Sequence, residues 1–275
     1  MADPRIGKPT PTEITALAGS YLTKPIYTST VFDYLLNLGD GLGSTVVSDI
    51  SGNALTATGV GTVAGDWQDT GLLFAVSEYA ETAASALLNL TGDLSVEVWV
   101  QTTNWLSGRS IFSIAGGSGE TEAENICIVL NEGTAASPNI DIQYIHEYST
   151  GVNELNTFNT NLSTSTIYHI VAVRDVTANT VILYIDGVAI ATFAYTNDPT
   201  LTANPKLTIS ANFAGGGGNM TNIFYRVHGA SRVWSPTEVL ELFDDPWGAF
   251  TNAITGAGSP SVGIRRRRRK SSIHR

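Results

Sequence analysis

The segment from Thr180 to Ala191 constrains the fold of this 275-residue chain more strongly than any other. It reads TVILYIDGVAIA, so that Asp186-Gly187 separates two apolar runs rich in β-branched residues. A two-residue turn between paired strands needs positive φ at both central residues, and Asp-Gly is among the pairs that adopt this most readily. The segment therefore predicts an antiparallel β-hairpin.

Strand patterns recur along the rest of the chain. In residues 94–101 (LSVEVWVQ) the valines at 96, 98 and 100 fall on one face, and the other face holds Ser95, Glu97, Trp99 and Gln101. Further strands are predicted at residues 139–146, 168–174, 207–210 and 223–228. Many strands separated by turns, with almost no helical periodicity, indicate an all-β, two-sheet antiparallel sandwich.

One short helix is predicted near the C-terminus, over residues 235–243. Ser235 is a suitable N-cap, Pro236 suits the first helical position, and Glu238 completes a capping box. We divide the chain into an N-terminal arm (1–30), the sandwich (31–247) and a C-terminal arm (248–275). The C-terminal arm consists of a Gly- and Ser-containing linker and a basic tail.

Charge is distributed unevenly along the chain. Residues 265–275 hold 7 of the 15 basic residues, whereas the other 264 residues hold 8 basic and 25 acidic ones, a net charge of −17. A basic end on an acidic body predicts an anchor to something anionic. Its partner would be phosphate, through non-specific nucleic-acid contact, or an acidic protein surface, including another copy of the chain; the alternative is a solubilising tail. The candidate anchoring residues are Arg265, Arg266, Arg267, Arg268, Arg269 and Lys270.

Composition excludes several classes of protein. With 43% hydrophobic and 15% charged residues, the chain is not an intrinsically disordered acidic protein. No stretch approaches the roughly 20 apolar residues of a membrane helix, and we expect no signal peptide because residues 1–10 lack an apolar core. The single cysteine, Cys127, excludes an intramolecular disulfide and a cysteine-based zinc site.

Four segments together resemble a known family. They are DISGNAL at 49–55, GDLSVEVWV at 92–100, the region from YHIVAVR at 168–174 to LYIDG at 183–187, and the end from Val227 to Leu242. In this order they resemble the concanavalin A-like lectin/glucanase fold, in its laminin-G-like branch. The resemblance covers about residues 31–245 and implies a jelly-roll sandwich. It also implies buried positions for Trp99 and Trp234 and a structural role for His169.

A second resemblance lies at residues 245–250, DPWGAF. This segment is similar to the NPW-x-x-F ending of laminin-G-like proteins encoded by tailed bacteriophages. It implies a virion component, assembled in the host cytoplasm, rather than a secreted lectin.

Some relatives of this fold are glucanases, which require two carboxylates on one strand face, roughly 5–5.5 Å apart in a retaining enzyme. The motif that supplies them, E-x-D-x-E, is absent here. Glu97 has no acidic neighbour on its face, and Asp141 is followed by Gln143. We therefore expect no enzymatic activity, and we interpret Glu97 as an exposed strand position.

Calcium is the metal that the resemblance favours, because related domains often hold Ca²⁺ on loops at the sheet rim. The candidate oxygen ligands are Asp49, Asn53, Glu120, Glu122 and Glu124. The alternative is that Asp49 bonds to its own backbone in a turn and that the glutamates belong to a solvated loop. No other cofactor is expected.

Sugar sites on this fold combine an aromatic platform with polar loop residues. Since Trp99 and Trp234 match buried positions, the candidates are Trp67 and Trp105. The alternative is that these aromatic side chains fill the core.

Two functions follow from these observations. The first is a non-enzymatic structural protein of a bacteriophage virion, namely a head decoration, head fibre or tail-associated subunit. It would be held by its terminal arms beside other virion proteins and would form a homo-oligomer. The second is a carbohydrate-binding adhesion module that recognises host surface glycans. Neither involves a membrane.

Overall fold

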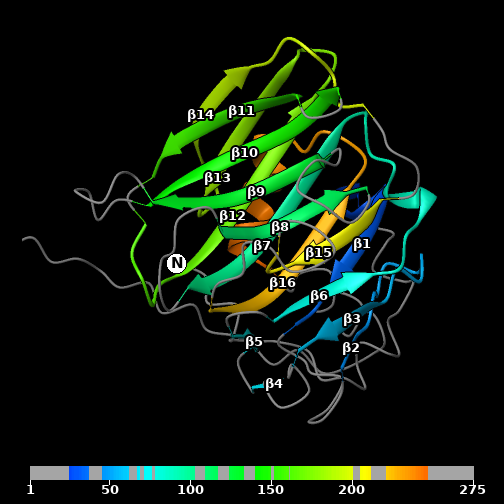
Figure 1. The fold of residues 1–275 in the computed structure, drawn as a ribbon. Helices are drawn as coiled ribbons and strands as arrows, with labels where there is room; N and C mark the ends of the chain where they lie inside the picture. The colour runs from blue at the N-terminus through cyan, green and yellow to red at the C-terminus, as the bar shows by residue number, and fades with distance from the viewer. Residues whose placement is uncertain are drawn as a thin grey trace, which may run out of the picture.

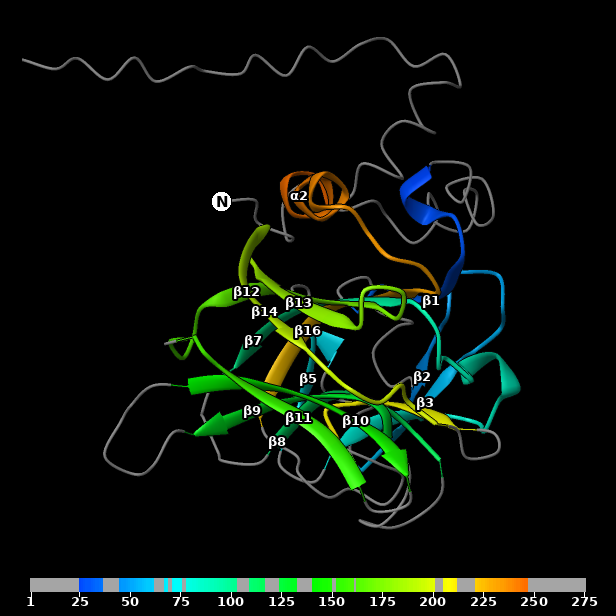
Figure 2. The ribbon, with the colours of Figure 1, turned by 90° about the horizontal axis from the view of Figure 1, so that it is seen from above.

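Two antiparallel β-sheets lie face to face in the computed structural model (Figures 1 and 2). The structure describes residues 25–36, 45–61, 67–68, 71–75, 78–102, 109–116, 124–132, 140–149, 152–160, 162–200, 205–211 and 221–246. The predicted all-β sandwich is confirmed.

Sheet A has the strand order β14-β13-β12-β7-β16-β5-β4, and β1 also pairs with β16. Its strands are β1 (Thr30–Tyr34), β4 (Trp67–Gln68), β5 (Gly71–Phe74), β7 (Leu94–Thr102), β12 (Ile167–Asp175), β13 (Thr180–Ile185), β14 (Val188–Ala194) and β16 (Asn222–Ala230).

Sheet B has the strand order β11-β10-β9-β8-β15-β6-β3-β2. Its strands are β2 (Val46–Val47), β3 (Ala57–Val60), β6 (Tyr79–Thr82), β8 (Arg109–Ala115), β9 (Glu124–Glu132), β10 (Ile140–Ser149), β11 (Val152–Asn159) and β15 (Lys206–Ile209).

The predicted hairpin at 180–191 is strands β13 and β14. Ile185 pairs with Val188, and the two turn residues between them, Asp186 and Gly187, have φ of 51° and 78°. These angles are the positive values that a type I′ turn requires.

In the described part of the chain, three helical segments accompany the sheets: η2 (Pro25–Tyr27), η4 (Ala86–Leu88) and α2 (Pro236–Asp244). In α2 the Ser235 side chain accepts from the backbone N–H of Glu238, and the Glu238 carboxylate accepts from the backbone N–H of Ser235. The predicted capping box is therefore confirmed. No helix among the described ranges is long and apolar enough to cross a membrane.

The main core lies between the sheets. The valines at 96, 98 and 100 of β7 point into it with at most 1% exposure, as the alternation predicted. Phe32 of β1 and Phe112 of β8 stack between the two layers, with ring centroids 5.6 Å apart. Such aromatic contacts join the sheets over a large buried apolar area.

The opposite face of sheet A is covered as well. Helix α2 lies across it (Figure 2), and η2 with Ile26 and Tyr27 is buried there. Trp234, Val239 and Leu242 also belong to this second apolar cluster. The interpretation of Glu97 as an exposed position is therefore wrong: its exposed fraction is 0%, because distant segments shield this face. Trp99 and Trp234 are each 1% exposed, as the resemblance implied.

Candidate functional site: a buried ionic cluster beneath helix α2

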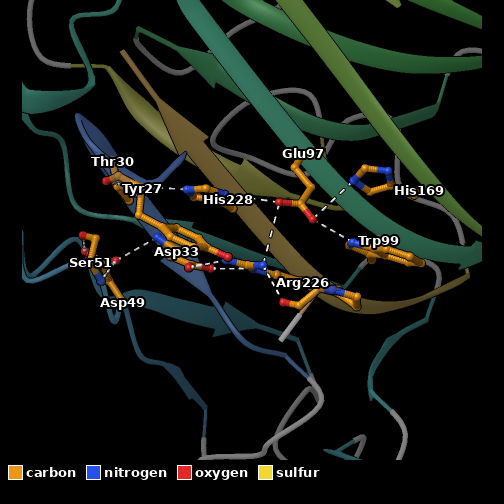
Figure 3. Close-up of polar contacts among 11 residues, drawn as sticks. Tyr27, Thr30, Asp33, Asp49, Ser51, Glu97, Trp99, His169, Arg226 and His228 are labelled. Carbon is orange, nitrogen blue, oxygen red and sulfur yellow. Dashed lines mark hydrogen bonds and ion pairs between the residues drawn. The ribbon is translucent and has the colours of Figure 1, made fainter. Parts of the chain in front are cut away.

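Acidic and basic side chains from four strands, β1, β7, β12 and β16, meet on the covered face of sheet A (Figure 3). Strand register places them, since Glu97 of β7 pairs with His228 of β16, and Asp33 of β1 pairs with the same histidine. Arg226 lies two residues before His228 and so shares its face. We refer to Asp33, Glu97, His169, Arg226 and His228 as the buried ionic cluster.

Arg226 is the cation at its centre. Its Nε and Nη2 donate to the two carboxylate oxygens of Asp33 at 3.0 and 2.7 Å, and its Nη1 lies 3.9 Å from Oε2 of Glu97. Burial lowers the pKa of Arg226, but the charges of Asp33 and Glu97 outweigh burial and raise it well above its usual range. The guanidinium therefore stays charged inside the protein.

Glu97 is surrounded by donors. Trp99 Nε1 donates to its Oε1 at 2.7 Å, His169 Nε2 lies 3.3 Å from the same oxygen, and His228 Nδ1 lies 3.2 Å from Oε2. Burial by itself raises the pKa of Glu97, but the Arg226 charge and the two histidines outweigh burial and hold it well below its usual range. The carboxylate is therefore ionised and fully engaged by protein groups.

Segments from both ends of the described chain cover the cluster and separate it from solvent. The Tyr27 ring lies 5.6 Å from the Arg226 guanidinium, and burial raises the pKa of Tyr27 to about 12, although Arg226 opposes this. Arg226 Nη1 donates to the Pro246 carbonyl at 2.9 Å. The Phe243 ring of α2 stacks on Trp99 at 5.9 Å. All five cluster side chains are 0% exposed, so the cluster has the groups of an acid–base site but no access for a substrate.

The predicted turn at 49–55 lies beside this cluster. Asp49 Oδ1 accepts from the backbone N–H groups of Asp33 and Ser51 at 3.0 and 2.9 Å, and its Oδ2 accepts from the Ser51 hydroxyl and the Leu55 N–H. Asn53 donates to the carbonyls of Thr30 and Val31. The bond from the Ser51 N–H fits the turn-forming alternative for Asp49, whereas Asn53 joins the turn to β1.

No group of three or more potential metal-ligating His, Cys, Asp or Glu side chains occurs within the described ranges. The calcium site stays a prediction. Glu120 and Glu122 lie outside the described residues, and Glu124 begins β9 with an undescribed side chain.

The other predicted site residues also remain untested. Trp67 lies in β4 with an undescribed side chain, and Trp105 and the anchoring residues 265–270 lie outside the described residues. Asp33, Arg226 and His228 were not predicted as site residues from the sequence. The only available signal was that Arg226 and His228 occupy alternate positions in the predicted strand at 223–228.

A second buried polar group lies at one end of the main core. Arg174 Nη1 donates to the Tyr144 hydroxyl at 3.3 Å, and His146 contacts that hydroxyl through Nδ1 at 3.2 Å. His146 Nε2 lies 2.9 Å from the Asn197 carbonyl, which can only accept, so Nε2 donates and Nδ1 accepts from Tyr144. Burial lowers the pKa of His146 to about 4.

Because the pKa of His146 is lowered, we expect the free energy of unfolding to depend on pH. Unfolded histidine binds a proton near pH 6.5, whereas folded His146 binds one only near pH 4. Between these values the unfolded state holds more protons, so the free energy of unfolding falls by about 3 kcal/mol as the pH drops through this window. We expect His146→Gln to remove this part of the slope in urea unfolding measured between pH 4 and 7. The other titrating groups are the same in both proteins, so the difference between the two slopes reports His146 alone. Equal slopes would contradict the lowered pKa of His146.

The fold and the buried ionic cluster define a two-sheet antiparallel β-sandwich domain. A family model described as the concanavalin A-like lectin/glucanases superfamily matches residues 74–239. This match spans more than half of the chain, and the chain belongs to this family. The resemblance inferred from the sequence is thereby confirmed. None of the curated proteins compared with the sequence matches it.

Solved structures share the fold at low sequence identity. Trypanosoma rangeli sialidase in complex with sialic acid is 14% identical, with a TM-score of 0.58, over 86% of this chain and 37% of that one. The binding domain of botulinum neurotoxin DC in complex with SialylT is 12% identical, with a TM-score of 0.58, over 80% of this chain and 52% of that one. The chain thus matches about a third to a half of the length of these proteins, and the likeness concerns the fold alone.

Proposed function

We propose that this protein is a non-catalytic carbohydrate-binding module that recognises host surface glycans. The observation that carries the proposal is the lectin-like sandwich with its family match over residues 74–239. Two similar structures, by their descriptions, contain sialic acid and SialylT. The absence of catalysis is supported by Glu97, since a carboxylate with 0% exposure cannot reach a polysaccharide.

Sugar binding requires an aromatic ring against which a pyranose can stack, beside polar groups that fix its orientation. Trp67 and Trp105 are the candidates, because Trp99 and Trp234 are buried on the covered face of sheet A. Strand β4, which contains Trp67, is the terminal strand of sheet A at the end opposite to β14. If Trp67 forms the aromatic platform, the proposed glycan site lies at this end of the sandwich.

A glycan array followed by titration tests this proposal. We expect saturable binding to a surface polysaccharide, weakened about tenfold or more by Trp67→Ala or Trp105→Ala, which corresponds to about 1.4 kcal/mol. Leu87→Ala is the matched control, because this 52% exposed side chain lies in η4. No reducing ends should be released from the bound polysaccharide. An array without signal, or equal loss in all three variants, would contradict the proposal.

A second candidate is a structural protein of a bacteriophage virion, and charge separation favours it. A tail with six consecutive cations follows a body of net charge −17, so that an acidic surface of a neighbouring virion protein could bind the tail. Pro246, close to the predicted C-terminal arm, is held to the sandwich because its carbonyl accepts from Arg226. The protein would then be a head decoration, head fibre or tail-associated subunit held by its arms.

Removal of residues 264–275 tests this second candidate. We expect the truncated protein to keep the unfolding transition of the full chain, because the described strands and α2 all lie before residue 264, but to be absent from purified particles. The test measures how much of the full-length and of the truncated protein is present in purified particles. A variant with Arg265–Lys270 replaced by serines separates loss of charge from loss of length. Normal incorporation of both variants would exclude the anchoring role.

A further inference from the structure

Basic residues are scarce in the sandwich. Residues 25–246 hold 5 lysines and arginines against 23 aspartates and glutamates, a net charge of −18. Recognition of an anionic sugar depends on basic side chains, because an arginine or lysine supplies the opposite charge and donates to the carboxylate. What each cation contacts therefore decides which sugars this domain can bind. The five are Arg109, Arg174, Lys206, Arg226 and Arg232.

Two of these arginines are fully buried. Arg174 has 0% exposure and donates to the carbonyls of Leu90 and Gly92. Arg226 has 0% exposure and donates to both carboxylate oxygens of Asp33. The three histidines of residues 25–246 have 0% exposure as well. None of these side chains can reach a ligand outside the protein.

The two partly exposed cations each have an acidic partner. Arg232 donates to the two carboxylate oxygens of Glu238 at 2.7 and 3.2 Å, and also to two backbone carbonyls of the segment around η2. Lys206 donates to the carboxylate of Glu81 at 3.1 Å. Arg109 begins β8 with an undescribed side chain. Among the basic side chains that the structure describes, every one is therefore bonded to other groups of the protein.

The two candidate tryptophans lie in a stretch without basic residues. Residues 25–108 include nine acidic residues and no lysine, arginine or histidine, and they contain both Trp67 and Trp105. Asp66 is bonded to Trp67 and Asp69 follows two residues later, so both of their Cα atoms lie within about 8 Å of the Cα of Trp67. Acidic neighbours without a cation make the electrostatic potential negative where the ring would hold a sugar.

A negative potential favours one class of glycan. Carboxylates accept hydrogen bonds from the hydroxyl groups of an uncharged sugar, whereas they repel the carboxylate of a sialic or uronic acid. We propose that the glycan site binds neutral polysaccharides and discriminates against acidic ones. This inference rests on the proposed glycan-binding function and adds the chemical class of the ligand to it.

The similar solved structures carry a different kind of ligand. By their descriptions, the Trypanosoma rangeli sialidase is in complex with sialic acid and the botulinum neurotoxin binding domain with SialylT. Their identity to this chain is 14% and 12%, so the likeness concerns the fold. Ligand charge is selected by individual side chains of a site, and a shared sandwich does not transfer that preference.

The basic tail would attract any acidic polymer, whatever the glycan site prefers. Residues 265–275 carry seven basic residues, and binding through such a tail weakens steeply as salt rises. The test therefore uses the chain without residues 264–275 beside the full chain. Circular dichroism and thermal unfolding verify that each protein is folded.

Matched pairs of glycans test the inference by titration calorimetry. One pair is a uronic acid polysaccharide and the same polymer with its carboxyl groups reduced to hydroxymethyl groups, and the other is a sialylated oligosaccharide and its desialylated form. In the truncated chain we expect the neutral member to bind at least about tenfold more tightly. Its dissociation constant should change less than about twofold between low and high salt. The full chain should add salt-sensitive binding to the acidic member.

A lysine beside the tryptophan on which binding depends tests the cause. Gln68→Lys for Trp67, or Asn104→Lys for Trp105, should narrow the preference for the neutral member at least about fivefold, because it supplies the missing cation. Leu87→Lys is the matched control, since it adds the same charge at a 52% exposed position in η4 and should leave the preference unchanged.

The outcomes separate this inference from the function on which it rests. Absence of binding to every glycan would contradict the proposed function. Saturable binding in which the truncated chain prefers the acidic member, or binds both members equally, would overturn the inference alone. So would a preference that the added lysine leaves unchanged.

Discussion

Replacing Arg226 by methionine is expected to lower the free energy of unfolding by about 3–5 kcal/mol. The substitution removes a buried cation that donates to both oxygens of Asp33 and lies 3.9 Å from Glu97. Both carboxylates have 0% exposure, so water cannot replace the lost partner. The Pro246 carbonyl also loses a hydrogen bond. Urea unfolding followed by tryptophan fluorescence measures the change, because Trp99 lies within hydrogen-bond distance of Glu97.

A partly exposed ion pair supplies the control for Arg226. Lys206 contacts Glu81 at 3.1 Å, with side chains 32% and 22% exposed. Lys206→Met should cost about 0–1 kcal/mol, because water stabilises the separated charges. Adding Asp33→Asn and Glu97→Gln to Arg226→Met should restore part of the lost stability, because the buried charges are then removed together. A loss below about 1 kcal/mol for Arg226→Met alone would show that the cluster does not hold the sandwich to its covering segments.

Gly229→Ala is expected to destabilise the protein by about 3 kcal/mol, at the upper end of the usual cost of overpacking. Gly229 of β16 lies opposite Phe32 of β1, and an added Cβ would lie 2.1 Å from the Cζ atom of that ring. The ring cannot move aside easily, because it is fully buried and stacked on Phe112 at 5.6 Å and on Tyr34 at 6.0 Å. Either the ring or the β1–β16 pairing must shift, and thermal or urea unfolding measures the cost.

Gly92→Ala is the matched control for this substitution, since a Cβ at Gly92 meets no atom within 4 Å. Its effect should stay within about 0.5 kcal/mol. Phe32→Leu shortens the side chain that meets the new methyl group. The double variant with Gly229→Ala should therefore be more stable than the sum of the two single changes implies, by about 0.5–3 kcal/mol. Additive effects would mean that the alanine does not act through the Phe32 ring.

Both substitutions concern how β1 is fixed to β16. Asp33 and Phe32 are neighbours on β1, so one faces the buried ionic cluster and the other faces the main core. The strand thus joins the two buried layers of the protein. Damage to either contact should loosen β1 and with it the turn at 49–55, which is bonded to Asp33 and Val31.

Local patterns predicted the strands, the hairpin turn and the helix cap because each depends on residues close in sequence. Asp186-Gly187 determines its own turn angles, and Ser235 and Glu238 cap a helix that begins between them. Alternation placed the valines of β7 in the core and Glu97 on the opposite face. The family resemblance, which adds the order of these segments, supplied the sandwich and the buried tryptophans.

The same patterns could not predict that the Glu97 side chain is buried. A polar residue beside Ser95 and Gln101 on a strand is ordinarily exposed, and only α2 and η2, which come from distant parts of the sequence, change this. Asp33 and Arg226 form their ion pair across 193 positions.

The sequence by itself determined which segments are strands, where the chain turns, where α2 begins and that the tail is basic, because these properties depend on neighbouring residues. Only the tertiary structure decided that the second face of sheet A is buried and that Arg226 meets Asp33 and Glu97 there. Burial and strand pairing depend on which distant segments meet, and no local pattern of residues records that.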